Sequence, residues 1–152
     1  MPSGDIFSGP FQAKILRNSR GIRLSETFEE CLAPELFRIA LIGHEGVLHD
    51  AIDRLHKLGY ALWLDDFGSG YSSFNVLKDY DFDVLKIDME FVRGMEGSHK
   101  SQTIVRTISD LAHSLGMLTL VEGVETKGQL SFLKKVGTDI AQGFLFSEPV
   151  PL

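Results

Sequence analysis

The feature that most constrains the fold is a series of short apolar segments, each of which ends in polar side chains. The polar ends are Asp65-Asp66 after residues 60–64, Lys86 and Asp88 within residues 84–88, Glu122 after residues 118–121, and Gln142 at the end of residues 139–142. Segments with the apolar periodicity of helices separate these strands, and this alternation predicts a parallel α/β sheet. Functional side chains gather at the carboxyl ends of the strands in such sheets, so we expect one polar rim there.

The chain is interpreted as a single domain over residues 11–152, preceded by a flexible lead-in at residues 1–10 that is rich in Gly, Ser and Pro. The predicted helices are 47–58, 72–80, 101–115 and a helix that begins after the N-cap Thr126 and ends before Gly137. The predicted strands are 60–64, 84–87, 118–121 and 140–146, with further strands at 11–16, 22–28 and 37–42.

Chain length distinguishes a closed barrel from the other architectures that a parallel α/β sheet can form. A closed (β/α)8 barrel needs roughly 200–250 residues, and this chain has 152. The sequence therefore predicts an incomplete or modified barrel, or an open sheet.

A net charge of −6 argues against DNA binding, which needs a basic surface. No apolar run reaches the length of a membrane span, and the single cysteine, Cys31, fits a reducing compartment, so we expect a cytoplasmic protein.

Two adjacent carboxylates, Asp65 and Asp66, form the strongest local signal, and Phe67-Gly68 follows them. At a strand end both side chains could reach divalent ions, and Mg²⁺ or Mn²⁺ would favour their oxygen atoms. The structural alternative is an aspartate turn or N-cap followed by a glycine. The next residues, Gly68 to Ser73, could offer backbone N–H groups to phosphate or could simply be a flexible connection.

Lys86 lies inside an apolar strand, where an unpaired ammonium group would be costly. It must therefore reach a polar cavity or a carboxylate. In a cavity it could help to orient or deprotonate a metal-bound water, or stabilise charge on phosphate. The structural alternative is an ion pair with Asp88 or Asp65.

Three more polar residues follow later strands. Glu122 could be a metal ligand or a general base. Glu125, which precedes Thr126, could equally be part of a helix start, because acids favour a helix N-terminus. Gln142 could hydrogen-bond a ligand or satisfy a loop. The histidines do not form a metal set, and His49 and His56, seven residues apart on one helix face, are expected in solvent.

These motifs together resemble the EAL-domain family of cyclic-di-GMP phosphodiesterases. The matching segments are Leu64 to Ser73, Leu85 to Asp88 with Phe91-Val92, Val121 to Thr126, Gln142 to Phe144, and Pro149. Their order and spacing match over residues 47–152, whereas residues 11–46 diverge. The resemblance implies a (β/α)8-type (TIM-barrel-like) fold, a two-metal site with Mg²⁺ or Mn²⁺, and hydrolysis of one phosphodiester of cyclic di-GMP to the linear dinucleotide.

The resemblance also implies roles for individual residues. Asp65 and Asp66 match metal ligands, Lys86 the water-orienting lysine, and Glu122 the essential glutamate that acts as ligand or base. Glu125 resembles the glutamate that holds the loop after Asp66, Gln142 the glutamine near metal and water, and Ser69 stands where the family often has Thr.

The first half departs from the family pattern. The signature Glu-Ala-Leu tripeptide is absent, and its remnant is either Glu26-Thr27-Phe28 or Glu30-Cys31-Leu32. The strand 37–42 lacks the acidic ligand that the family has there. Loss of a ligand or its support costs about 10–100-fold in metal affinity or activity. We therefore predict weak or absent hydrolysis by this chain alone. The alternative to an enzyme is an inactive EAL-like module that binds cyclic di-GMP or a protein partner. An incomplete barrel also favours a homo-oligomer or a partner protein.

Overall fold

The computed structural model describes residues 13–15, 45–58, 61–67 and 73–146. They form a five-stranded sheet with the order β1-β5-β4-β3-β2. The strands are β1 (Ala13–Ile15), β2 (Trp63–Phe67), β3 (Val84–Ile87), β4 (Leu118–Val121) and β5 (Ile140–Gln142). Strands β2 to β5 run parallel, as the alternation predicts. Strand β1 differs from that expectation, because it pairs with β5 in the antiparallel direction.

The two faces of the sheet carry different side chains because successive residues of a strand point to opposite faces. Leu85, Ile87 and Val121 belong to a large core that also holds residues of helix α5 (His99–Ser114). Val84 and Leu120 belong to a second cluster on the opposite face, with Leu118, Ile140 and Trp63. Two residues along each strand from this second cluster lie Asp65, Lys86, Glu122 and Gln142. The alternation therefore places an apolar layer at the amino ends and a polar layer at the carboxyl ends of the same face.

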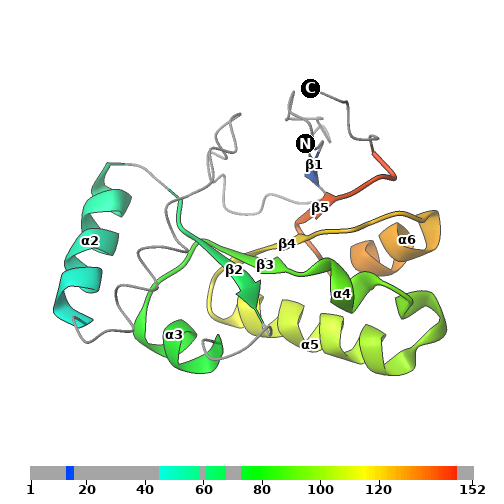
Figure 1. Ribbon diagram of the computed structural model, residues 1–152, viewed down its shortest axis with the longest axis horizontal. Coiled ribbons are helices and arrows are strands. Elements are labelled where there is room, and N and C mark those ends of the chain that lie inside the picture. The colour runs from blue at the N-terminus through cyan, green and yellow to red at the C-terminus, as the bar shows by residue number, and fades with distance from the viewer. Residues whose placement is uncertain (1–12, 16–44, 59–60, 68–72, 147–152) are drawn as a thin grey trace.

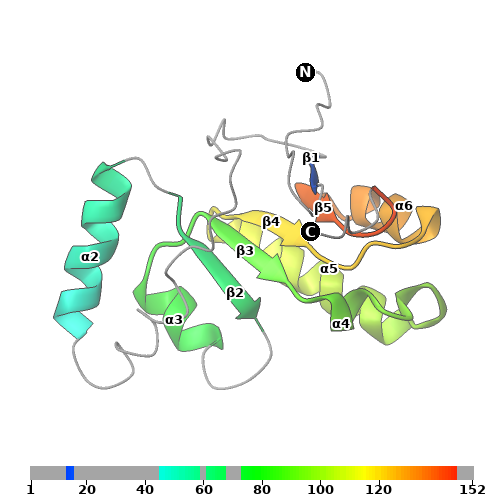
Figure 2. The ribbon, with the colours of Figure 1, turned by 45° about the horizontal axis from the view of Figure 1, so that its top comes forward.

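Helices α3 (Ser73–Asp79) and α5 lie together on one side of the strands, and α2 (Glu45–Lys57) stands beyond β2 at the end of the sheet (Figure 1). Helix α2 is anchored there because Ile52 packs with Leu62 just before β2. Figure 2 shows β2, β3 and β4 side by side, with α6 (Lys127–Lys135) beside β5. The four predicted helices are thus present.

Local signals set the ends of two helices. In α6 the side chain of Thr126 accepts from the backbone N–H of Gln129, and the side-chain oxygen of Gln129 accepts from the backbone N–H of Thr126. This capping box confirms the predicted N-cap. Gly137 has φ of 81°, as a helix-ending glycine requires. Helix α5 begins at His99, two residues earlier than predicted, because the side chain of Ser98 accepts from Ser101 N and caps it.

Two predicted strand ends are wrong, and two short helices were not predicted. Strand β2 runs through both aspartates to Phe67 instead of ending at Leu64. Strand β5 stops at Gln142 instead of running to Phe146, and the next residue, Gly143, lies so close to the backbone of Val124 that a Cβ would clash. The short helices α4 (Met89–Val92) and η1 (Met95–Gly97) were not expected from periodicity, which needs longer segments. The lead-in 1–10 and the predicted strands 22–28 and 37–42 lie outside the described residues.

Candidate functional site at the carboxyl ends of the strands

The two aspartates occupy an irregularity in the pairing of β2 with β3. Leu64 pairs with Leu85 and Phe67 pairs with Ile87, so Asp65 and Asp66 together stand opposite one residue, Lys86. This two-against-one register is that of a β-bulge, and bulges re-aim side chains beside active sites. The pairing between the strands therefore brings Asp65 to the lysine and sets the backbone of both aspartates opposite it.

Lys86 joins the two neighbouring strands. Its Nζ lies 3.1 Å from Oδ2 of Asp65 and 3.2 Å from Oε1 of Glu122. The side chain of Lys86 is 22% exposed, and those of Asp65 and Glu122 are 42% and 28% exposed. The three charged groups are therefore only partly covered and remain within reach of a small ligand.

Burial and charge act differently on the pKa values of Lys86 and Glu122. Burial raises the pKa of Glu122, and the charges of Asp65 and Asp88 raise it further, while Lys86 opposes the shift without cancelling it. Burial alone would lower the pKa of Lys86, but the charge of Glu122 and the bond to Asp65 outweigh it, so that this pKa is raised. Two carboxylates therefore outweigh the effect of burial on the pKa of Lys86. The single lysine beside Glu122, which it shares with Asp65, does not offset the effect of burial on the pKa of Glu122.

The neighbouring polar residues have separate positions. The carboxylate of Asp88 accepts from Glu90 N at 2.7 Å and so caps α4. The sequence offered Asp88 or Asp65 as the ion-pair partner of Lys86, and the structure shows the pair with Asp65. The described contact of Asp88 is that of a helix cap. Gln142 ends β5 on the face of the polar layer. Glu125 is exposed beyond Glu122, and the loop 68–72 that it is expected to hold lies outside the described residues.

Three predicted site groups cannot be placed in this arrangement. Glu26 and Ser69 lie outside the described residues, and of Asp66 only the backbone is described. Within the described parts of the chain, no three His, Cys, Asp or Glu side chains converge to hold a metal ion. Asp65 and Glu122 offer the hard oxygen donors that Mg²⁺ and Mn²⁺ prefer, but two carboxylates fill only a part of an octahedral shell. The described donors therefore fit such an ion in kind and form part of a site.

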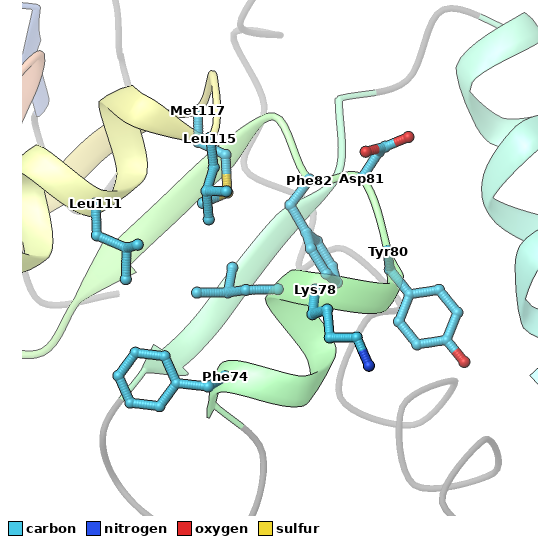
Figure 3. A pocket seen from close by; sticks show the side chains of 9 residues that line it. Phe74, Lys78, Tyr80, Asp81, Phe82, Leu111, Leu115 and Met117 are labelled. Carbon is cyan, nitrogen blue, oxygen red and sulfur yellow. The ribbon is translucent and has the colours of Figure 1, made fainter.

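A separate cavity lies at the opposite ends of the strands. It has a volume of about 460 Å³ and opens between α3 and the end of α5 (Figure 3). The side chains of Phe82 and Met117, which precede β3 and β4, line it together with those of Phe74, Leu77, Lys78, Tyr80, Asp81, Leu111 and Leu115. None of these residues is a predicted site residue, so this cavity does not belong to the polar rim.

Sequence reasoning also missed two pairs of polar side chains. His56 Nε2 lies 2.9 Å from Asp83, although this histidine was expected in solvent, and His113 Nε2 lies 2.8 Å from Asp139. The sequence signal for each pair was a histidine shortly before one strand and an aspartate directly before the next strand.

None of the helices in the described residues is both long and apolar enough to cross a membrane.

Comparison with known proteins places these features in a family. The chain is 38% identical over 125 residues to the cyclic di-GMP phosphodiesterase PdeR of Escherichia coli, covering 82% of this chain and 19% of PdeR. The structure of the EAL enzyme Bd1971 with cAMP and cyclic di-GMP bound superposes with a TM-score of 0.68 at 36% identity, covering 74% of this chain and 30% of Bd1971.

The manganese and cyclic di-GMP complex of BlrP1 from Klebsiella pneumoniae gives a TM-score of 0.60 at 38% identity and covers 66% of this chain and 26% of BlrP1. The chain thus spans about a third or less of each of these proteins. These neighbours show the TIM-barrel-like EAL fold, of which the described sheet is a part. Since the family model described as the EAL domain matches residues 23–149, which include all four strands of the polar rim, the chain belongs to the EAL domain family.

Proposed function

We propose that this chain acts in cyclic-di-GMP signalling, and that its polar rim binds the cyclic dinucleotide with a divalent cation. The implied reaction is metal-dependent hydrolysis of one phosphodiester to the linear dinucleotide, and we expect it to be weak in this chain alone. One observation supports this proposal most strongly: Lys86 lies between Asp65 and Glu122, on three neighbouring strands of an EAL domain. Relatives and neighbours with this domain are named as cyclic di-GMP phosphodiesterases or bind cyclic di-GMP.

The roles proposed for the residues follow their chemistry and their positions. Asp65, Asp66 and Glu122 would hold Mg²⁺ or Mn²⁺, and the manganese in BlrP1 supports this class of ion. Such an ion supplies charge stabilisation at phosphate and acidifies a bound water. Lys86 carries a proton at Nζ, as its raised pKa implies, and can orient a water or pair with a phosphate oxygen. In the alternative role of general base, Glu122, whose pKa is also raised, would accept a proton from a water that Lys86 orients.

Other residues would support the site. Gln142 ends β5 beside these strands and offers an amide to the ligand or to a water. Glu125 and Ser69 would order the loop that follows Asp66, and Glu26 remains the proposed remnant of the Glu-Ala-Leu motif. A cytoplasmic location and a homo-oligomer or a protein partner remain predictions.

The second candidate is an EAL-like module that binds cyclic di-GMP or a protein without hydrolysis. Two observations favour it. Fewer than three potential ligands converge in the described part of the structure, and the sequence of residues 37–42 lacks an acidic side chain. A site with too few metal ligands would still offer Lys86 to a phosphate group.

The deciding experiment is calorimetric titration of cyclic di-GMP into the purified chain with Ca²⁺, followed by product analysis with Mg²⁺ or Mn²⁺. Binding with slow cleavage, lost in Glu122→Ala and kept in Glu90→Ala, would support the proposed enzyme. Glu90 is a matched control because it carries an exposed carboxylate on α4, beyond the same strand ends. Binding without cleavage would establish the nucleotide-binding module. Absence of binding would contradict both nucleotide functions and leave a protein partner.

A further inference from the structure

The connection after β4, residues 122–126, carries Glu122 and is fixed by backbone bonds on two sides. Glu122 N donates to Ile87 O at 3.1 Å, which continues the pairing of β4 with β3. Val124 N donates to Gln142 O, and Leu145 N donates to Val124 O, both at 3.0 Å. The connection therefore takes its position from β3 on one side and from the end of β5 on the other.

The same connection touches the short helix that follows β3. Gly123 has φ of 73°, and a Cβ at this glycine would lie 2.5 Å from Cβ of Met89, the first residue of α4. Only a glycine combines that backbone conformation with such a close approach. The connection and α4 are thus in direct contact, and the connection carries Glu122, whose Oε1 lies 3.2 Å from Lys86 Nζ.

One buried side chain bridges these two segments. Gln129, which is 6% exposed, accepts through Oε1 from Glu125 N at 2.7 Å and from Thr126 N at 3.0 Å. Its Nε2 donates to Val92 O, the last residue of α4, at 3.3 Å. One amide group therefore bonds the segment after β4 with its oxygen and the segment after β3 with its nitrogen.

We propose that Gln129 is a positioning residue that holds the Glu122 connection against α4 and thereby sets the geometry of Glu122 relative to Lys86. This inference rests on the proposed function for its catalytic consequence. Helix capping alone does not require an amide here, because a glutamate at this position of a capping box accepts the same N–H bonds. Of the two residue types, only glutamine also supplies an N–H donor for Val92 O.

That difference defines the decisive variant. Gln129→Glu keeps the acceptor for Glu125 N and Thr126 N but places a second oxygen opposite the Val92 carbonyl. Gln102→Glu is the matched control, because Gln102 Nε2 also donates to a carbonyl of the same region, Met95 O at 2.9 Å, and this bond lies outside the connection. Both variants lose one amide donor, so general loss of stability affects both.

The test compares three measurements in both variants: Mn²⁺ affinity, turnover of cyclic di-GMP, and the NMR resonance of Lys86 Nζ. We expect Gln129→Glu to lower Mn²⁺ affinity or kcat about 10-fold or more, the size of effect seen for residues that support ligands. We also expect it to shift the Lys86 resonance, whereas Gln102→Glu should leave the resonance and the affinity near the wild-type values at a comparable Tm.

The outcomes separate this inference from the proposed function. If the wild-type chain binds neither Mn²⁺ nor cyclic di-GMP, the proposed function is wrong, and the Lys86 resonance still decides the role of Gln129. Equal effects of the two substitutions, or an unchanged Lys86 resonance in Gln129→Glu, would overturn the positioning role. Hydrogen exchange at the amides of Glu125 and Thr126 in Gln129→Ala checks that the connection itself depends on this side chain.

Discussion

Lys86 shows how one residue can serve both the fold and the site. A lysine inside a buried strand needs a partner, and it has two, Asp65 and Glu122, on the strands at either side. These same carboxylates are the proposed metal ligands, so one arrangement satisfies the buried charge and concentrates the reactive groups. Sequence reasoning anticipated a structural pair and a catalytic lysine as alternatives, but the geometry is compatible with both at once.

Substitution of Glu122 by glutamine should separate stability from function. Because the pKa of Glu122 is raised in the fold, its ionised form is less favourable there than in the unfolded chain. The resulting loss of stability begins above the unfolded pKa and is complete above the higher folded pKa. We therefore expect Glu122→Gln to match or exceed the wild-type Tm at pH 7.5, with the difference shrinking as the pH falls toward 4.

The same variant should lose binding of Mn²⁺ by about 10–100-fold, if Glu122 is a ligand. Thermal unfolding across the pH range and calorimetry with Mn²⁺ measure the two effects. Glu90→Gln is the control, since it removes an exposed carboxylate on α4, beyond the end of β3. A lower Tm for Glu122→Gln at every pH would contradict the inferred cost of the buried charge.

At the scale of elements, prediction succeeded where the signals are local. Strands β3 and β4 were predicted to the residue, because polar residues follow both apolar segments and a polar residue or a helix-ending glycine lies shortly before them. Helix α6 was located by Thr126 and Gly137. The bulge in β2 could not be predicted, since it depends on pairing with a strand about twenty residues away. Two adjacent aspartates look like a strand end in sequence, but across from Lys86 they continue the strand.

A repeated polar contact fixes the amino ends of the strands. Asp83 accepts from Leu62 N at 2.7 Å and contacts His56, and Asp139 accepts from Thr119 N at 2.9 Å and contacts His113. In each case the histidine lies six positions before the residue whose backbone N–H bonds the aspartate, Leu62 just before β2 or Thr119 in β4. Each aspartate thus joins a helix end and its following strand to the next strand of the sheet. This contact lies at the opposite end of the strands from Lys86.

The two aspartates should differ in their contribution to stability. The Asp139 side chain is fully buried and also accepts from Thr119 Oγ1, whereas that of Asp83 is 30% exposed. Loss of an acceptor leaves buried donors unsatisfied, so we expect Asp139→Ala to cost about 2–4 kcal/mol and Asp83→Ala about 1–2 kcal/mol. Urea unfolding measures both values. Asp110→Ala, at an exposed position of α5, is the control, and an Asp83→Ala cost equal to or above that of Asp139→Ala would contradict the argument.

At the scale of the whole molecule, the described rim is one side of a barrel mouth. Strands β2, β3 and β4 bring Asp65, Lys86 and Glu122 together, and β5 adds Gln142 beside them. The rim could be predicted from the sequence because parallel strands align their carboxyl ends. The remaining ligands of the family could not be located, because the residues expected to carry them fall in the divergent segment 11–46.

The small number of metal ligands among the described residues leads to a quantitative expectation for the purified chain. Each missing ligand or support costs about 10–100-fold, so hydrolysis of cyclic di-GMP should be at least that much slower than by the cyclic di-GMP phosphodiesterase PdeR. Initial rates with Mn²⁺, measured over a range of protein concentrations, test this. A rate per chain that rises as dimers form would mean that a second copy completes the site. A rate equal to that of PdeR from a monomeric chain would contradict the expectation, because the groups present in one copy would then be sufficient.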